Sequence, residues 1–398
     1  MLKTNAYDIL VVGAGIFGIT TALEMKERGY RVAVLDPGPL PHPLAASTDI
    51  SKMVRMEYGA DESYMTLGEQ AYLGWLQWNE ELGDALFHDV GVSRLTRMPM
   101  APGGYEYESY HLLRKRGHTP ERLTEETISR RFPAWKPGLF VDGFFHAQGG
   151  YVESGRVVAA LVRLAQAKGI ILYPDQMVKA LIKEDHQVKG VCTGDGSVFH
   201  AEHIVVAAGA WTVLLVSELA SLLKITGHPV FHLKPANPDL FTAPLFPAFT
   251  VDVAQTGWYG FPFHPREQVV KIANHGVGQV LHPEHDERVV TDRDVEQLRT
   301  FLAATIPALS DAPLVATRRC LYVDTPDGDF WIDHHPHYAG LTVATGDSGH
   351  AFKFAPILGG LVADAIEGKP NRWLSKFRWR DFPTHDIRAE AGRYHGEI

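Results

Sequence analysis

Cysteine is scarce in this chain, since only Cys192 and Cys320 occur among its 398 residues. Two thiols can form at most one disulfide bond, which excludes the disulfide-stapled scaffolds of small secreted proteins. Such a low count is typical of proteins from a reducing compartment. We therefore expect a cytoplasmic protein.

Long runs of one charge are also missing. The chain has 38 Lys and Arg against 47 Asp and Glu, a formal net charge of -9, and no basic run is long enough to follow a phosphate backbone. Nucleic-acid-binding proteins present such a run or patch. We therefore expect small-molecule partners and no nucleic acid.

No apolar run indicates a membrane span. The longest one, residues 204–223, contains Gly209, Ser217 and Glu218, so it predicts a buried strand that runs into a helix. The apolar start at residues 9–19 is interrupted by glycines and lacks the strongly charged flank of a signal peptide. With 45% hydrophobic and 21% charged residues, the chain is expected to be globular, with two domains or one domain carrying an insertion. We expect no membrane partner.

A glycine pattern near the N-terminus is the strongest local motif. Gly13-x-Gly15-x-x-Gly18 follows a predicted buried strand at residues 7–12. Glycines at this spacing allow a tight turn, close approach of the backbone to a pyrophosphate, and close packing of the next helix on the strand. The N–H groups and the dipole of the helix N-terminus attract phosphates. The pattern predicts a dinucleotide site, against the alternative of a glycine-rich turn without a ligand.

The residues after the glycines support this prediction. Helical spacing continues to Gly29, a second strand is expected at residues 30–35, and Asp36 ends it. Short connections between strand, helix and strand indicate a parallel sheet. An acidic residue in the place of Asp36 can accept hydrogen bonds from an adenosine ribose. Both NAD and FAD contain that ribose, so these residues leave the choice of cofactor open.

The residue pattern that predicts secondary structure changes twice in the middle of the chain. Residues 61–83 have a helical, aromatic pattern, whereas residues 87–145 are irregular and rich in glycine, proline and charge. Residues 151–209 then predict a helix, a strand, a hairpin at Asp195-Gly196 and a further strand. We interpret the last segment as a return to the nucleotide-binding domain.

The remaining chain is β-rich at first. Residues 226–313 contain aromatic clusters and end in an amphipathic helix after a Thr291-x-x-Asp294 cap. A buried strand at residues 341–344 and a helix at 355–367 follow, and the polar residues from Arg378 on are expected to form a loosely attached tail.

Five blocks of residues then occur in the same order as in monomeric sarcosine oxidases and their fructosyl amino acid oxidase relatives. The chain resembles this family, which belongs to the D-amino acid oxidase-like superfamily, over nearly its whole length. The most specific block is the one around Cys320. The blocks are the glycine pattern with residues 45–55, Tyr259-Gly260-Phe261-Pro262, Lys271-x-x-x-His275, residues 318–330, and Gly349-His350-Ala351-Phe352-Lys353.

The resemblance implies the fold class and the domains. It implies an α/β, two-domain protein with a glutathione-reductase-like FAD-binding domain, which contains the Rossmann βαβ unit, and an antiparallel-sheet substrate domain. The FAD-binding domain is assigned to residues 1–86, 147–215 and 316–377, the substrate domain to 87–146 and 216–315, and the tail to 378–398. A monomer is expected.

The resemblance also implies how FAD is held. Cys320 corresponds to the residue that forms an 8α-thioether with the flavin, and the adjacent Arg318 and Arg319 would favour the thiolate that this bond requires. The alternative for Cys320 is a small buried hydrophobic residue, which is the interpretation we give to Cys192. Further FAD-binding positions are implied for Gly13, Gly15, Gly18, Asp36, Ser47, Lys52, Gly209, Gly349 and Lys353.

Substrate and oxygen residues follow from the same blocks. Arg55 and Lys353 correspond to the pair that binds the substrate carboxylate, and solvated surface charges are the alternative. Lys271 corresponds to the lysine near flavin N5 that activates O2. His275 and Tyr259 correspond to active-site residues that shape the pocket, with core packing as the competing interpretation.

The expected function is that of an FAD amine oxidase that oxidises an N-substituted amino acid to an imine and reduces O2 to H2O2. Sarcosine oxidases carry arginine where this chain has Lys52, and Asp324 is also closer to the fructosyl amino acid oxidases. A fructosyl or other bulky N-alkyl amino acid is therefore ranked above sarcosine, and a pipecolate-like imino acid third. The alternatives are an FAD dehydrogenase that uses an electron carrier and a non-catalytic dinucleotide-binding protein.

A metal centre is not expected. The cluster Asp333-His334-His335-Pro336-His337 lacks a matched set of ligands elsewhere, and its proline would disrupt helical ligand spacing. We interpret these histidines as solvated loop residues.

Overall fold

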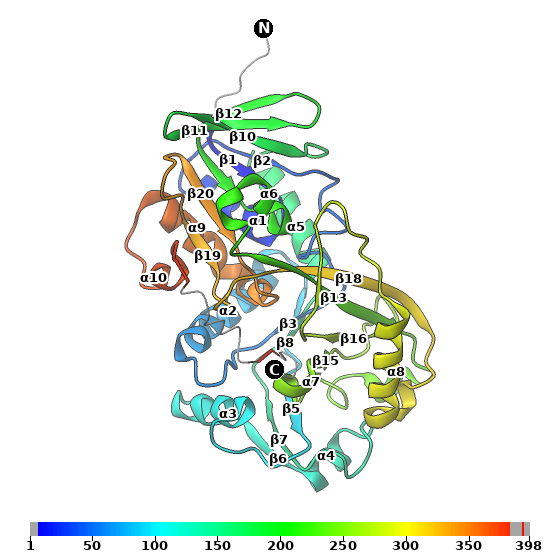
Figure 1. The fold of residues 1–398 in the computed structure, drawn as a ribbon. Coiled ribbons are helices and arrows are strands. Elements are labelled where there is room, and N and C mark those ends of the chain that lie inside the picture. Colours follow the sequence, from blue (N-terminus) through cyan, green and yellow to red (C-terminus); the bar gives the residue numbers. More distant parts are fainter. Residues whose placement is uncertain (1–6, 383–391, 394–398) are drawn as a thin grey trace.

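A computed structural model describes residues 7–382 and 392–393 of the chain, and its ribbon shows two large sheets, one above the other (Figure 1). The first sheet has eight strands in the order β10-β11-β12-β1-β2-β9, with β20 paired to β12 and β19 to β20. Its strands β1, β2, β9, β12 and β20 pair in parallel. The strands are β1 (Tyr7–Val12), β2 (Val32–Leu35), β9 (Ile171–Tyr173), β10 (Val178–Glu184), β11 (Gln187–Thr193), β12 (Val198–Val206), β19 (Trp331–His334) and β20 (Leu341–Thr345).

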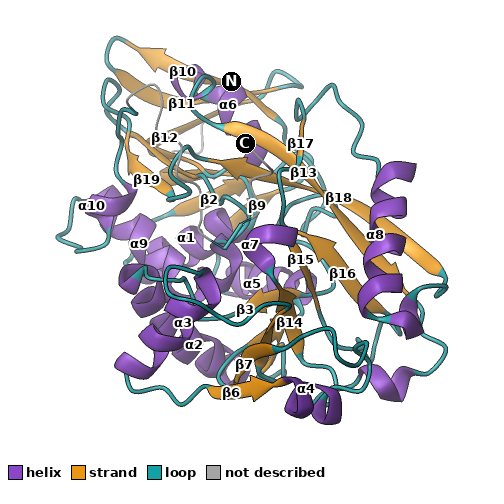
Figure 2. Ribbon diagram, turned by 60° about the horizontal axis from the view of Figure 1, so that its bottom comes forward, coloured by secondary structure: helices purple, strands orange, loops and turns teal. Residues whose placement is uncertain are grey.

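Helices cover one face of this sheet (Figure 2). Strand β1 explains the layering, because Ile9 and Val11 enter one apolar core while Leu10 and Val12 enter the core on the other side. A strand buried on both faces is continuously apolar, as the parallel arrangement requires. The helices of the first core are α1 (Ile16–Glu27), α2 (Glu62–Glu81), α5 (Ser154–Ala167) and α9 (Ala355–Glu367).

The second sheet has nine strands in the order β17-β13-β16-β15-β14-β5-β7-β6, with β18 paired to β13. It is antiparallel except for the β5 and β14 pair. Its strands are β5 (Val92–Thr96), β6 (Glu121–Thr124), β7 (Asp142–His146), β13 (Lys224–Leu233), β14 (Ala248–Val251), β15 (Trp258–Gly260), β16 (Val270–Asn274), β17 (Gln279–Val280) and β18 (Leu314–Asp324).

A small sheet and shorter helices complete the described fold. The small sheet has the order β3-β8-β4. Its strands are β3 (Lys52–Val54), β4 (Phe87–His88) and β8 (Gly150–Val152), and the remaining α-helices are α3 (Tyr105–Lys115), α4 (Glu125–Arg131), α6 (Thr212–Leu215), α7 (Val253–Thr256), α8 (Asp292–Thr305) and α10 (Leu374–Phe377).

Most of the elements expected from the sequence are confirmed. The first strand, the helix after the glycines and the helix at 355–367 are present, and the second strand begins at Val32. β11 and β12 flank the Asp195-Gly196 hairpin. The Thr291 hydroxyl accepts from the Asp294 N–H in a capping box at α8. None of the helices that the structure describes is long and apolar enough to span a membrane.

The description of residues 87–145 as irregular is wrong. This segment contains three strands of the nine-stranded sheet, β5, β6 and β7, together with α3 and α4. β5 is buried at every position although it includes Ser93, Arg94 and Thr96. A strand of this kind has neither an alternating nor an apolar pattern, and its Arg94 is paired with the distant residues Glu57 and Thr250.

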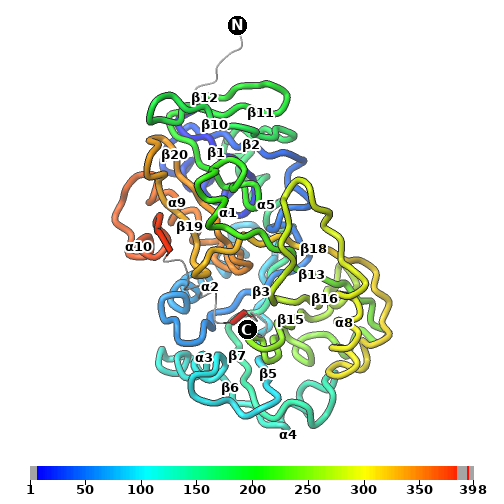
Figure 3. Tube along the Cα trace, in the orientation of Figure 1, coloured from blue at the N-terminus to red at the C-terminus, as the bar shows by residue number. Residues whose placement is uncertain are grey.

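The tail also differs from expectation where it is described. Arg380 forms an ion pair with Asp327 at 2.7 Å, and Arg393 is buried and pairs with Asp324. Residues 392–393 therefore lie in the middle of the molecule, as the trace in Figure 3 shows. These residues are firmly held, which corrects the expectation of a loose attachment. The rest of that expectation, at residues 383–391 and 394–398, lies outside the described residues.

The division into two domains stays a prediction, but β18 bears on its boundary. This strand pairs with β13 along Leu314 to Asp324, so it belongs to the nine-stranded sheet. The boundary placed at residue 316 falls inside it. β18 thus brings Cys320 from the second sheet toward the first.

A buried ion pair lies where β5, β7 and the chain after β3 meet. The Arg94 guanidinium donates to Glu57 at 3.0 Å, and His146 Nδ1 lies 3.0 Å from the other Glu57 oxygen. Burial acts to raise the pKa of Glu57, but Arg94 and His146 outweigh it and hold that pKa below its usual value. Both members of the pair are almost fully buried, so each depends on the other for its charge to be compensated.

We expect Glu57→Gln to lower the melting temperature clearly, because Arg94 would keep a buried charge without its carboxylate. Breaking a buried pair on one side costs about 3–5 kcal/mol. Glu62→Gln is the matched control, since Glu62 pairs with Lys115 and Arg116 at the surface and should change the melting temperature little. Equal melting temperatures of both variants would contradict the role given to Glu57.

Candidate functional site

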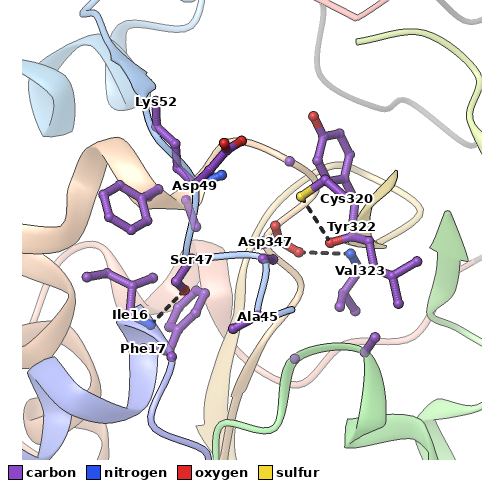
Figure 4. Close-up of a pocket in the computed structure, with 18 of the residues that line it drawn as sticks. Ile16, Phe17, Ala45, Ser47, Asp49, Lys52, Cys320, Tyr322, Val323 and Asp347 are labelled. Carbon is purple, nitrogen blue, oxygen red and sulfur yellow. Dashed lines mark hydrogen bonds between the residues drawn. The ribbon is translucent and has the colours of Figure 1, made fainter. Parts of the chain in front are cut away.

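One pocket contains nearly all the residues singled out from the sequence. It runs from the glycine turn after β1 to the loop before α9 and takes walls from both large sheets. Figure 4 shows part of its lining, with Ser47, Asp49 and Lys52 on one side and Cys320 and Tyr322 on the other. The expected site residues that line it are Gly13, Gly15, Asp36, Ser47, Lys52, Arg55, Gly209, Tyr259, Lys271, His275, Cys320, Gly349 and Lys353.

Gly13 and Gly18 build the turn at one end of the pocket. Gly13 has φ +103°, and a Cβ on it would lie 2.4 Å from the Ala207 carbonyl oxygen. A Cβ on Gly18 would lie 1.8 Å from the Gly13 carbonyl oxygen, so Gly18 supports the turn from behind instead of lining the pocket. Only glycine fits these positions without backbone movement. The turn is therefore built as a dinucleotide fingerprint requires.

The helix that follows presents its N-terminus to the pocket. α1 has no side-chain cap at Gly15, and the Ile16 N–H donates to the Ser47 hydroxyl at 2.9 Å. The Asp36 carboxylate accepts from the Ala14 N–H at 2.8 Å. Burial raises the pKa of Asp36, although the Ala14 and Gly38 N–H groups act in the opposite direction. This end of the pocket fits the phosphates and ribose of a dinucleotide.

Cys320 is buried on β18, and its two arginine neighbours point to opposite sides. Arg318 donates to the carbonyl oxygens of Thr48 and Ala45 in the loop beside the pocket. Arg319 turns away and donates to the Val289 and Gly227 carbonyl oxygens at 2.6 and 3.1 Å. The expectation that both arginines act on Cys320 is therefore wrong for Arg319, because successive side chains of a strand face opposite sides.

Lys271 enters the pocket from β16 and meets a carboxylate that the sequence did not reveal. Its ammonium donates to Asp49 at 2.6 Å and to the Ser51 carbonyl oxygen, and both charged side chains are 3% exposed. Burial lowers the pKa of Lys271 to about 8, with Asp49 acting to raise it. Burial also disfavours the Asp49 anion, but Lys271 outweighs this and holds the Asp49 pKa well below its usual value. The pocket thus contains a lysine that titrates near neutral pH.

Arg55 and Lys353 lie on the pocket wall, as the expected carboxylate-binding pair must. Arg55 comes from the chain after β3, and Lys353 from the loop before α9. They are 8% and 5% exposed, so the alternative of solvated surface charges is wrong. Two buried cations on one wall favour an anionic ligand.

His275, Tyr259 and Lys52 surround the same cavity. His275 is buried, and its ring lies 6.5 Å from the Tyr259 ring, edge to face. Burial raises the pKa of Tyr259, which keeps its hydroxyl protonated. The Lys52 ammonium lies 5.7 Å above the Phe352 ring. These residues give the cavity aromatic walls.

The sequence analysis gave no functional role to four further residues of the pocket. Arg288 lies 4.7 Å above the Trp211 ring. The half-buried Asp347 accepts from the Val323 N–H at 2.8 Å, and burial raises its pKa to about 6. Asp49 was inside the quoted block 45–55 but was given no role. Tyr322 stacks on His228 at 3.9 Å beside Arg393. A pattern of neighbouring residues gives no signal for such long-range contacts.

The histidine cluster lies away from the pocket. His334 Nδ1 is 3.2 Å from the Thr342 hydroxyl, and buried His335 is 3.5 Å from Glu218. Burial, mainly, lowers the pKa of His335. The sequence analysis interpreted His335 as a solvated loop residue. This interpretation is wrong, because the His335 side chain is packed in the structure. Within residues 7–382 and 392–393, no group of three or more His, Cys, Asp or Glu side chains could hold a metal.

Known proteins resemble the chain over nearly its full length. A family profile described as FAD dependent oxidoreductase (DAO) matches residues 8–365. L-saccharopine oxidase of Schizosaccharomyces pombe is 29% identical, with 94% of this chain and 93% of that protein covered. Monomeric sarcosine oxidase of a Bacillus species is 26% identical, with 93% and 95% covered.

Solved structures agree with the fold. The deglycating enzyme fructosamine oxidase (Amadoriase II) of Aspergillus fumigatus superposes with a TM-score of 0.83 at 26% identity, covering 98% of this chain and 94% of the other.

Proposed function

Because the chain belongs to the family of FAD-dependent oxidoreductases, we propose that it oxidises the C–N bond of an N-substituted amino acid to an imine and reduces O2 to H2O2. The observation that carries the proposal is the single pocket. It joins a dinucleotide turn at Gly13 to a buried lysine with a lowered pKa, Lys271, and to the cations Arg55 and Lys353. FAD, when bound, supplies the acceptor for the electron pair of the amine.

Arg55 and Lys353 fix the substrate by its carboxylate. A guanidinium offers a fork of N–H donors and an ammonium adds a point charge, so together they orient the α-carbon. The aromatic walls at Tyr259, Phe261 and Phe352 desolvate the amine, which lowers the pKa of its ammonium form and favours the neutral, reactive amine. A dedicated catalytic base is then not needed. Water hydrolyses the released imine.

Lys271 supports the reduction of O2. Negative charge develops on O2 as it accepts electrons, and a fixed cation lowers the energy of that charge in a site that excludes water. The ion pair with Asp49 holds the ammonium in one place.

The proposed substrates are bulky. Relatives with 26–29% identity are named for L-saccharopine, sarcosine and fructosamine, and each of these has a substituted amine nitrogen. Lys52 and Asp324, together with these relatives, support a fructosyl or other bulky N-alkyl amino acid over sarcosine, with a cyclic imino acid third. We further propose a monomer. We also propose a cytoplasmic location, which is supported by the absence of a disulfide bond between Cys192 and Cys320.

A peroxide-coupled screen tests the proposed reaction. We expect kcat/KM to be highest for glycated or other bulky N-alkyl amino acids, lower for sarcosine and pipecolate, and negligible for primary amino acids. Peroxide formation with primary amino acids alone would overturn the proposed substrate class. Substrate oxidation that reduces a dye without forming peroxide would identify a dehydrogenase instead.

We also propose that Cys320 holds FAD through an 8α-thioether. Cys320 is buried and lines the pocket, which supports this proposal. The C–S bond would replace a C–H bond of the flavin 8-methyl group. This change would release the thiol proton and a methyl proton, and O2 would take up the two electrons and two protons as H2O2.

Cys320→Ser should therefore release its yellow colour into the supernatant when the protein is precipitated with acid, whereas the unchanged protein should keep it in the pellet. Cys192→Ser is the matched control, since Cys192 lies in β11 away from the pocket, and its pellet should stay yellow. A wild-type pellet without flavin would refute the covalent bond but not the binding of FAD.

The role of Lys271 predicts a pH dependence. Lys271 is a cation below its pKa of about 8, so the rate at which the reduced holoenzyme consumes O2 should be high below pH 8 and fall above it. Lys271→Met should reduce this rate about a hundredfold at pH 7. Asp49→Asn should move the fall to lower pH, because burial then acts on the ammonium without an opposing charge.

The control for these variants is Lys224→Met, since Lys224 is an exposed residue of the same sheet. Stopped-flow mixing of photoreduced enzyme with O2 measures the rate without turnover of any substrate. An unchanged rate in Lys271→Met would show that this lysine has no part in the oxygen step.

A further inference from the structure

Tyr58 contacts both cations of the proposed carboxylate-binding pair. Its ring centroid is 4.5 Å from the Arg55 guanidinium carbon and 5.2 Å from the Lys353 ammonium. Tyr58 is 3% exposed. Arg55 and Lys353 come from distant parts of the chain, so Tyr58 is a contact that they share.

The Tyr58 hydroxyl belongs to a directed chain of hydrogen bonds. Lys353 Nζ donates to the Tyr58 oxygen at 2.8 Å, and that oxygen is 3.0 Å from His350 Nδ1. His350 Nε2 lies 2.9 Å from the Gly328 carbonyl oxygen, which can only accept. The Nε2 atom must therefore carry a proton, and when the imidazole is neutral its Nδ1 is an acceptor. With a neutral His350, Lys353 donates to Tyr58, and Tyr58 donates to His350.

We propose that Tyr58 is the positioning residue of the carboxylate-binding pair, with its ring supporting Arg55 and its hydroxyl orienting Lys353. This inference rests on the proposed function, because it assumes that Arg55 and Lys353 bind the substrate carboxylate.

The flexible Lys353 side chain needs a residue that restrains it. An ammonium on a flexible four-carbon stem loses rotamer freedom whenever it is held in one direction. Here the Tyr58 hydroxyl and the His350 carbonyl oxygen, at 2.7 Å, hold it before a ligand arrives. A hydroxyl is neutral, so it restrains the ammonium without cancelling its charge. The restraint lowers the entropic cost of binding an anionic ligand.

The Tyr58 ring is itself held rigidly. It stacks on Tyr64 at 4.8 Å with an interplanar angle of 17°, and Phe354 and His350 lie at 5.9 and 5.7 Å. Its attraction for Arg55 is a cation–π contact, which gains strength where water is excluded. Arg55 is held by a second contact as well, since it donates to the Tyr105 hydroxyl at 3.0 Å. Tyr58 thus gives both cations a rigid contact partner.

Tyr58→Phe tests the inference, because it removes the hydroxyl and retains the ring. Isothermal titration calorimetry of the holoenzyme with 2-furoate measures carboxylate binding without turnover, and 2-furamide has the same shape without the charge. We expect the variant to bind 2-furoate about tenfold more weakly and 2-furamide unchanged. With the best substrate of the peroxide screen, KM should rise by a similar factor while kcat stays within about twofold.

Tyr64→Phe is the matched control. It removes a hydroxyl from the same aromatic cluster and keeps the ring that stacks on Tyr58. It should bind 2-furoate as the unchanged protein does. Melting temperatures of both variants separate local from global effects.

The possible outcomes of these titrations separate the role of Tyr58 from the proposed recognition of a carboxylate. Weaker binding of furoate alone, in Tyr58→Phe alone, supports the inference. Unchanged furoate binding, an equal loss with furamide, or an equal loss in Tyr64→Phe overturns it. If the unchanged protein does not bind furoate at all, the proposed carboxylate recognition fails, and the inference fails with it.

Discussion

The buried ion pair of Lys271 and Asp49 joins the two halves of the pocket. Lys271 belongs to β16 of the nine-stranded sheet, and Asp49 to the loop before β3. The backbone oxygen of Asp49 accepts from the Gly155 N–H and the Ser154 hydroxyl at the start of α5, at 2.8 and 2.9 Å. The loop is thereby fixed to a helix of the first core. Since a charge left alone in such a place costs several kcal/mol, the pair fixes how the pocket walls meet.

Around this pair the pocket gathers several cations. Arg55 donates to the Tyr105 hydroxyl, Lys353 donates to the Tyr58 hydroxyl, and Arg318 donates to backbone oxygens of the 45–48 loop. Positive charge beside a cavity attracts anionic ligands. The phosphates of a dinucleotide and the carboxylate of an amino acid are anions of this kind.

The sequence predicted the parts of this architecture that depend on local rules. Glycine spacing gave the turn at Gly13, helical spacing gave α1 and α9, and the cap at Thr291 gave the start of α8. Prediction from the sequence failed where contacts with distant residues determine the structure. β5 contains Ser93, Arg94 and Thr96 in a buried strand because Glu57 and Thr250 partner Arg94. Arg319 does not face the Cys320 site, because neighbouring residues of a strand point to opposite sides of the sheet.

The amino-acid sequence by itself determined the dinucleotide turn, the elements around it and, through family blocks, many of the residues that line the pocket. The tertiary structure alone decided which of these side chains touch. It brought Asp49 to Lys271, Tyr58 into contact with Arg55 and Lys353, and Arg393 from a polar tail to Asp324. The reason is physical: patterns along a chain report backbone geometry and burial, whereas charge pairing in a core depends on atoms that only folding brings within a few ångströms.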